Sequence, residues 1–330
     1  MAFNSIQEVF DAFTKLKVLV IGDSMIDTYI YGQVNRISPE APVPIVNVSG
    51  EEHRLGGAAN VALNLKALGI EVKLCSVCGK DASGEHLIQL LKEQGLSSSG
   101  MLEIDGRQTT VKKRVMSGSQ HLLRVDHETD QYLTSEQNSG LSQIILPLIP
   151  AVDLIIFEDY DKGVISKSLI DEVVSLAQLH HVPVAVDPKF RNYHDYKGVD
   201  LFKPNLVEFK KSTTTDSTDL MGNAQALVSQ LKLKNLLLTL SSKGVLYCSE
   251  KLSGQLDAHI REVADVSGAG DTVIALAGAA LALGLSITFI AEFANLGGGI
   301  VCEYPGVVPI IKSRLLDEAK RSDLLLRQLV

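Results

Sequence analysis

The sequence contains no tryptophan and only four cysteines among its 330 residues. Cys75 and Cys78 form a CxxC spacing, which is also found in zinc and thiol redox sites. They lie on an apolar run that begins at Glu71 and is typical of a strand, where residues three apart point to opposite faces. Cys248 and Cys302 have no second such spacing and no histidine nearby. We therefore expect four structural thiols in a reducing compartment.

Long apolar runs are also missing. Met1 to Lys17 mixes polar and apolar residues, so no secretory leader is expected. The longest apolar run, Thr272–Leu285, is shorter than the roughly 20 residues that cross a bilayer, and it predicts a buried helix. A net charge of -8 argues against a general nucleic-acid or anionic-membrane binder. These features predict a cytoplasmic protein with no nucleic-acid or membrane partner.

Two nucleotide-binding motifs are missing as well. A nicotinamide-dependent dehydrogenase needs GxGxxG after its first strand, but Ile21 is followed by Gly-Asp-Ser-Met-Ile-Asp. A P-loop kinase needs GxxxxGK[ST], which does not occur in the sequence. Both enzyme classes are excluded.

Short apolar runs alternate with segments of helical periodicity along the whole chain. This alternation predicts an α/β fold with a doubly wound, mainly parallel sheet in one domain over residues 1–330. The expected strands are Val18–Ile21, Val72–Val77, Leu154–Phe157, Val182–Val186, Leu236–Leu240 and Val245–Cys248. The expected helices are Ala58–Leu68, Gly84–Gln94, Glu136–Leu148, Ser168–Leu179, Leu220–Lys232, Thr272–Leu283 and Ile287–Cys302.

Two segments do not fit the helix–strand alternation. Residues 29–50 contain three prolines and an extended alternation, and residues 106–127 alternate similarly and carry several basic side chains. We expect them to pair into a small β lid whose apolar face covers the site or a second subunit.

The strongest chemical motif is Asp265-Val-Ser-Gly-Ala-Gly-Asp271, which leads directly into an apolar helix. Gly268, Ala269 and Gly270 allow backbone N–H groups to face an anion at a helix N-terminus. Asp271 can then accept a proton from a substrate hydroxyl. A glycine-containing loop with an aspartate cap accounts for this pattern about as well.

This motif resembles the DTxGAGD signature of the ribokinase/phosphofructokinase-B superfamily of sugar kinases. Gly56-Gly57-Ala-Ala-Asn60 resembles the N-terminal signature of that superfamily, and Asp27 matches its sugar-binding aspartate. The resemblance covers roughly residues 15–315. It implies a ribokinase-like fold, ATP as phosphoryl donor, Asp271 as catalytic base and a sugar held by Asp27, Gly56, Gly57 and Asn60.

The resemblance also implies nucleotide contacts. Asn205-Leu-Val-Glu208 is similar to the NxxE motif that organises Mg²⁺ and the ATP phosphates, and Mg²⁺ keeps several of its waters. Asp265 and Ser267 leave room for a monovalent cation, K⁺, although serine replaces the usual threonine. The remaining ATP-binding residues implied are Lys189, Thr239, Ser241, Gly244, Gly268, Gly270 and Asn295.

A narrower resemblance is to the D-glycero-D-manno-heptose-7-phosphate kinases, which act in ADP-heptose synthesis for lipopolysaccharide. It rests on Arg36-Ile-Ser-Pro-Glu-Ala-Pro-Val-Pro44, Asp159-Tyr-Asp-Lys-Gly163 and Asp187-Pro-Lys189. It implies that the anomeric hydroxyl of a 7-phosphorylated heptose is the acceptor. Arg114, Arg124 and Lys162 would then hold the sugar phosphate. Cross-strand pairing of the arginines and a solvated surface lysine are the alternatives.

Family lids often form dimers, so we expect a homodimer through the β lid that buries Val43, Ile45, Val111 and Val115 on one side of its strands. Glu158 departs from the serine common in heptose kinases, and Gly297-Gly298 and Glu303–Gly306 depart from the usual pattern near the adenine. The adenylyltransferase domain fused to many of these kinases has no counterpart here, so we expect a kinase alone. Another ribokinase-type sugar or nucleoside kinase is the main alternative, and a non-catalytic sugar-binding regulator is a second one.

Overall fold

The computed structural model describes residues 3–118, 120–213 and 219–329. Within these ranges the main sheet has nine strands in the order β13-β12-β11-β10-β9-β8-β1-β4-β5. The strands are β1 (Lys17–Gly22), β4 (Glu71–Gly79), β5 (Met101–Ile104), β8 (Leu154–Glu158), β9 (Val184–Asp187), β10 (Leu201–Phe202), β11 (Asn235–Thr239), β12 (Val245–Ser249) and β13 (Ser253–Leu256).

The seven strands from β11 to β5 in this order are parallel to one another. Strand β12 is antiparallel to β11, and β13 is antiparallel to β12, at one edge of the sheet. The register places Gly22 beside Glu158, and Glu158 beside Asp187. Three neighbouring strands therefore present their carboxyl ends together, which is where ligands bind in sheets of this type.

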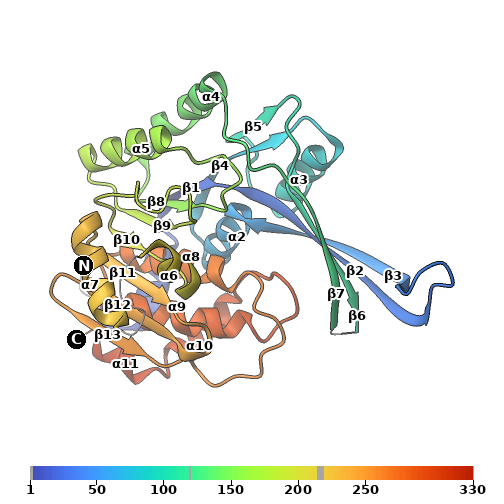
Figure 1. Ribbon diagram of the computed structural model, residues 1–330. Helices are drawn as coiled ribbons and strands as arrows, with labels where there is room; N and C mark the ends of the chain where they lie inside the picture. The colour runs from blue at the N-terminus through green and yellow to red at the C-terminus, as the bar shows by residue number, and fades with distance from the viewer. Residues whose placement is uncertain (1–2, 119, 214–218, 330) are drawn as a thin grey trace.

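Helices cover both faces of the main sheet (Figure 1). Along β1, Val18 and Val20 join one hydrophobic core, and Leu19 and Ile21 join the other. The first core includes α1 (Ile6–Phe13), α2 (Ala58–Leu68), α3 (Ala82–Glu93), α8 (Ala269–Ala282), α9 (Ile287–Val301), α10 (Lys312–Ala319) and α11 (Asp323–Arg327). The second includes α4 (Ser135–Ile145), η1 (Leu146–Ala151), α5 (Lys167–Leu179), α6 (Leu206–Ser212) and α7 (Leu220–Leu231). The expected doubly wound α/β fold is confirmed.

The two cysteines of the CxxC spacing lie on opposite faces of β4. Cys75 belongs to one core and Cys78 to the other. Burial raises the pKa of Cys75 to about 12 and that of Cys78 to about 11, so neither thiol is a ready nucleophile. Their expected structural role agrees with this placement.

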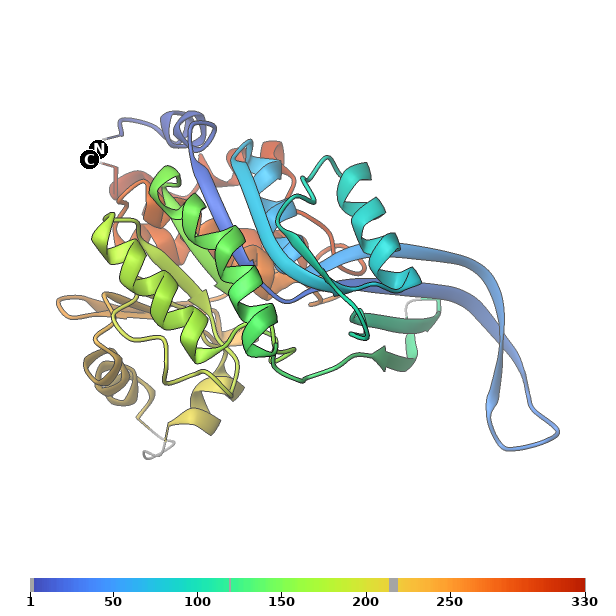
Figure 2. The same cartoon turned by 90° about the horizontal axis from the view of Figure 1, so that it is seen from above.

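A second sheet has the order β3-β2-β6-β7. It consists of β2 (Ser24–Ile37), β3 (Pro44–Gly57), β6 (Val111–Ser117) and β7 (Gln120–His127). Strand β2 pairs with β6, so the segments 29–50 and 106–127 lie side by side, as expected from the sequence. The far half of the β2–β3 hairpin extends away from the helices (Figure 2).

Several elements were not expected from the sequence. Helix α1 begins after Ser5, whose side chain accepts a hydrogen bond from the Glu8 N–H, and it buries Phe10 and Phe13. Helices α6, α10 and α11 and strands β5, β10 and β13 are short, so their periodic signal is weak. In the part of the chain that the structure describes, no helix is long and apolar enough to span a membrane.

Candidate active site

The Gly-Ala-Gly segment forms the N-cap and the first two residues of α8. The sequence placed the start of this helix at Thr272, which is wrong: α8 begins at Ala269, and Gly268 is its N-cap with a φ of +78°. Glycine adopts this backbone conformation readily. The first N–H groups of the helix have no intrahelical acceptor, so the N-terminus of α8 can receive an anion.

Asp271 lies in this first turn and is only 3% exposed. Its Oδ2 accepts a 2.8 Å hydrogen bond from Asn60 Nδ2, and its Oδ1 accepts a 2.7 Å bond from the Tyr160 hydroxyl. Burial raises the pKa of Asp271, and the two donors oppose that shift. The carboxylate is fixed in place and keeps lone pairs for a further donor.

Asp27 and the Gly56–Asn60 motif adjoin Asp271. Asp27 on β2 is buried, and its Oδ1 forms an ion pair with the Arg114 guanidinium from β6. Gly56 lies against Asp27, because a Cβ at this position would overlap Oδ2 of that carboxylate. Gly57, at φ +58°, turns the chain into α2, which carries Asn60. The structure therefore brings Asp27, both glycines and Asn60 together beside Asp271.

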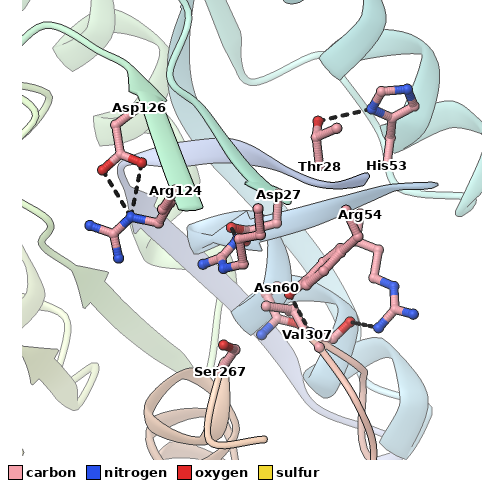
Figure 3. A network of polar contacts seen from close by, with 12 residues as sticks. Asp27, Thr28, His53, Arg54, Asn60, Arg124, Asp126, Ser267 and Val307 are labelled. Atoms are coloured by element: carbon pink, nitrogen blue, oxygen red, sulfur yellow. Dashed lines mark hydrogen bonds and ion pairs between the residues drawn. The ribbon is translucent and has the colours of Figure 1, made fainter. Parts of the chain in front are cut away.

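Arg114 and Arg124 are directly opposite each other on β6 and β7. Arg124 Nε donates to Asp126 Oδ1 at 2.9 Å, and its side chain is 57% exposed (Figure 3). Lys162 Nζ donates to Glu128 Oε1 at 2.7 Å. Each of these three cations thus already has a carboxylate partner, which an incoming phosphate would have to displace or share.

A second group of charges lies at the ends of β9 and β10. Lys203 Nζ is 2.7 Å from Asp187 Oδ2, and Lys189 pairs with Glu208. Burial raises the pKa of Asp187 to about 6, although both lysines lower it. A Cβ on Gly270 would lie 3.7 Å from Lys203 Nζ, so this lysine is close to the first turn of α8.

Asn205 and Glu208 form a capping box at the start of α6. The Asn205 side chain accepts hydrogen bonds from the Val207 and Glu208 N–H groups at 2.9 Å, and Glu208 Oε2 accepts from the Asn205 N–H at 2.8 Å. Among the described residues, no group of three His, Cys, Asp or Glu side chains could enclose a metal ion. Glu208, bonded on both oxygens, fits a contact to Mg²⁺ through water.

The remaining predicted nucleotide residues follow β11. The Thr239 N–H donates to the Pro204 carbonyl at 3.1 Å, which places Thr239 next to Asn205. Ser241 and Gly244 bound a tight turn before β12, and both have positive φ. Asn295 on α9 donates through Nδ2 to the Asp257 carbonyl at 2.8 Å, so it holds the chain that precedes the α8 motif.

Asp265 closes the loop before α8. Its Oδ1 accepts hydrogen bonds from the N–H and the hydroxyl of Ser267, both at 2.9 Å, and its Oδ2 accepts from the Gly306 N–H at 2.9 Å. These donors lower the pKa of Asp265 against the effect of burial. His121 from β7 lies 3.7 Å from the same carboxylate, so the second sheet contacts this loop. Arg54 on β3 donates to the Val307 carbonyl at 3.1 Å (Figure 3).

The sequence analysis assigned no site role to three residues of this site: Tyr160, Lys203 and Glu158. Tyr160 is inside the Asp159–Gly163 segment, and Lys203 is two residues before Asn205. The only sequence signal for Tyr160 and Lys203 was their position within or next to a recognised motif. Glu158 is buried, one of its oxygens lacks a hydrogen-bond partner, and burial raises its pKa well above the usual range. In the strand register this acid lies beside Asp187, whose charge raises the pKa of Glu158 further.

Comparison with known proteins gives a consistent match. Residues 15–313 match the pfkB family of carbohydrate kinases. A protein of Bordetella bronchiseptica named D-beta-D-heptose 7-phosphate kinase is 38% identical over 311 residues, which cover 94% of this chain and 98% of that protein. A protein of Trichlorobacter lovleyi named bifunctional protein HldE is 36% identical over 315 residues, or 94% of this chain. The match spans 64% of the length of that bifunctional relative.

Solved structures show the same fold. Phosphofructokinase-2 from Escherichia coli in complex with potassium aligns with a TM-score of 0.74 at 17% sequence identity. The alignment covers 92% of this chain and 99% of that one.

Proposed function

The chain belongs to the pfkB family of carbohydrate kinases, and we propose that within it the protein phosphorylates the anomeric hydroxyl of D-glycero-D-manno-heptose 7-phosphate. The relative named heptose 7-phosphate kinase, which matches almost end to end, supports the choice of substrate. The observation that carries the proposal is the buried Asp271 carboxylate at the N-terminus of α8, fixed by Asn60 and facing the Asp27 side of the site.

The reaction needs a base and a site for phosphoryl charge. The sugar oxygen attacks the γ-phosphorus of ATP, the bond to the β-phosphate oxygen breaks, and the hydroxyl proton passes to Asp271. N–H groups of Gly268, Ala269 and Gly270 would face the transferring phosphoryl group and stabilise its charge. The ammonium group of Lys203, which is paired with Asp187, lies close to Gly270 and would also face this phosphoryl group.

We assign the acceptor sugar to the side of Asp27, Gly56, Gly57 and Asn60. Its distal phosphate would bind Arg114, Arg124 or Lys162, whose carboxylate partners Asp27, Asp126 and Glu128 hold them in reach. Charge-assisted contacts of this kind favour a phosphorylated sugar over a free one.

ATP would lie on the side of β9 to β12. The proposed contacts are Lys189, Asn205, Glu208, Thr239, Ser241, Gly244, Gly268, Gly270 and Asn295. Mg²⁺ would arrive with the phosphates and contact Glu208 and Asn205 through water; it would supply charge neutralisation. For K⁺ we propose the surroundings of Asp265 and Ser267, supported by the potassium complex of the Escherichia coli neighbour.

We propose a single kinase domain over residues 1–330 with a lid formed by about 29–50 and 106–127, and a homodimer through that lid. The exposed apolar side chains of the second sheet and of its β2–β3 connection support this assembly; they include Ile37, Val43, Val48, Leu123 and Val125. The four free cysteines support a cytoplasmic location.

A substrate panel tests the assignment. ATP and Mg²⁺ are incubated with heptose 7-phosphate, free heptose, fructose, ribose and adenosine, and phosphate transfer is followed by ³¹P NMR. We expect a 1,7-bisphosphate from heptose 7-phosphate as the main product. Equal or better use of free ribose, fructose or adenosine would instead assign the general sugar- or nucleoside-kinase activity.

A further inference from the structure

Tyr160 and Asn60 donate to different oxygens of the Asp271 carboxylate. Its hydroxyl donates to Asp271 Oδ1 at 2.7 Å, while Asn60 donates to Oδ2 at 2.8 Å. Each oxygen of the carboxylate therefore accepts one hydrogen bond from the protein. A carboxylate oxygen has two lone pairs, so each keeps one for another donor.

The loop that carries Tyr160 is held rigidly between β8 and α5. The N–H groups of Tyr160 and Lys162 donate to Asp23 Oδ2 at 2.8 and 3.1 Å, and the Val164 N–H donates to Oδ1 at 3.2 Å. Asp23 itself is 1% exposed. Three backbone bonds to one buried carboxyl group fix the position from which the phenol reaches Asp271.

The Tyr160 ring also contacts cations from both sides of the site. Lys112 Nζ from β6 lies 5.6 Å from the ring centroid, and Lys189 Nζ lies 5.1 Å from it. Lys112 belongs to the second sheet, and Lys189 pairs with Glu208 of the capping box. Tyr160 thus lies where the sugar side and the nucleotide side of the site meet.

We propose that Tyr160 is a positioning residue for phosphoryl transfer: its hydroxyl holds the Asp271 carboxylate in the orientation that receives the acceptor proton. The inference rests on the proposed role of Asp271 as base. Tyr160 keeps its own proton, so the proton of the sugar hydroxyl goes to Asp271 alone.

The electrostatic surroundings set the direction of the effect. Burial raises the pKa of Asp271, and the hydrogen bonds from Asn60 and Tyr160 lower it. Loss of the phenol therefore raises this pKa further and protonates the base at a higher pH. The other charged groups that face Asp271 or the phenol are Asp27, Glu158, Asp187, Lys203, Lys189 and Lys112. The Tyr160→Phe substitution leaves all of them in place.

The experiment compares pH profiles of kcat/KM for wild type, Tyr160→Phe and Tyr196→Phe, using whichever sugar the wild type accepts best. Tyr196 is the matched control, because its hydroxyl donates to the buried Asp159 Oδ2 at 2.8 Å and not to the base. We expect the acid limb of Tyr160→Phe to move up by about 1–2 pH units, since a hydrogen bond to a charged group changes a pKa by roughly that amount. KM for ATP should change little, and Tyr196→Phe should keep the wild-type limb.

A fluorinated tyrosine, incorporated uniformly, supplies a second test that does not depend on the folding of the Tyr160→Phe variant. It keeps the shape of the ring and makes the phenol a stronger donor, so the acid limb should move to lower pH. An unmoved limb in folded Tyr160→Phe, or an equal shift in Tyr196→Phe, would overturn the proposal. If the proposed role of Asp271 as base were wrong instead, Asp271→Asn would retain full activity. That outcome distinguishes failure of the proposed function from failure of the Tyr160 proposal.

Discussion

Asn60 Nδ2 and Asp271 Oδ2 are 2.8 Å apart although 211 positions separate the two residues in the chain. Asn60 ends the Gly56–Asn60 motif at the start of α2, and Asp271 lies in the first turn of α8. One hydrogen bond therefore joins the proposed sugar-binding motif to the proposed base. The two helices pack against each other in one core, which keeps this bond in place.

Asp271→Asn should reduce kcat by about 10²–10⁴-fold, because the amide cannot accept the hydroxyl proton. ATP affinity should stay close to that of the wild type, measured by calorimetry. Asp81→Asn is the matched control, since Asp81 caps α3 outside the site. A wild-type kcat in Asp271→Asn would remove the base assignment.

The raised pKa of Asp271 predicts the acid limb of the pH profile. The base acts only when ionised, so kcat/KM should fall as the pH decreases through this pKa. Burial raises the pKa, so the limb should lie above that of an ordinary aspartate. A profile of kcat/KM that stays flat below pH 5 would contradict the structural environment of Asp271.

The sequence predicted the layers of the fold better than the details of the site. Apolar runs and helical periods are local, so the parallel sheet and the position of Asp271 at a helix start could be inferred. Asn60 and Asp271 were each selected by their own motif, but nothing local indicates that they touch. Tyr160 and Lys203 were missed for the same reason, because their roles depend on partners 111 and 16 residues away in the chain.

Glu208→Gln should raise the Mg²⁺ concentration required for half-maximal rate and lower kcat. Glutamine can keep the capping-box bond to the Asn205 N–H, so α6 should stay folded while the charge beside Lys189 is lost. Glu136→Gln, in the first turn of α4, serves as control. An unchanged Mg²⁺ titration would make Glu208 a structural cap only.

The proposed dimer interface requires one correction to the sequence prediction. Val111 was expected on the dimer face together with Val43, Ile45 and Val115, but it is only 6% exposed and belongs to a hydrophobic core. Val43 remains available at 51% exposure. A residue at the base of the second sheet, such as Val111, packs in a hydrophobic core and is therefore not available to a dimer interface.

Sedimentation should therefore show a dimer at micromolar protein, and Leu123→Asp should weaken it because it places a charge among exposed apolar side chains. Leu179→Asp changes an exposed leucine at the end of α5 and should leave the dimer intact. A wild type that sediments only as monomer would rule out the lid-mediated dimer.

Arg114 and Arg124 should contribute unequally to recognition of a distal phosphate. Arg114 is half of a buried ion pair, so Arg114→Met leaves the Asp27 charge unpaired and should raise KM for every sugar. Arg124 is exposed, so Arg124→Met should weaken only the phosphorylated substrate. Equal losses for phosphorylated and free sugars in Arg124→Met would exclude this arginine from phosphate binding.

The central claim is that the accepted sugar already carries a phosphate at its far end. The most direct measurement is the ratio of kcat/KM for heptose 7-phosphate to that for the same heptose without phosphate, at fixed ATP and Mg²⁺. Two charge-assisted contacts predict a ratio of about 10²–10⁴. A ratio near one would contradict the account, and the site would then be that of a kinase for unphosphorylated sugars.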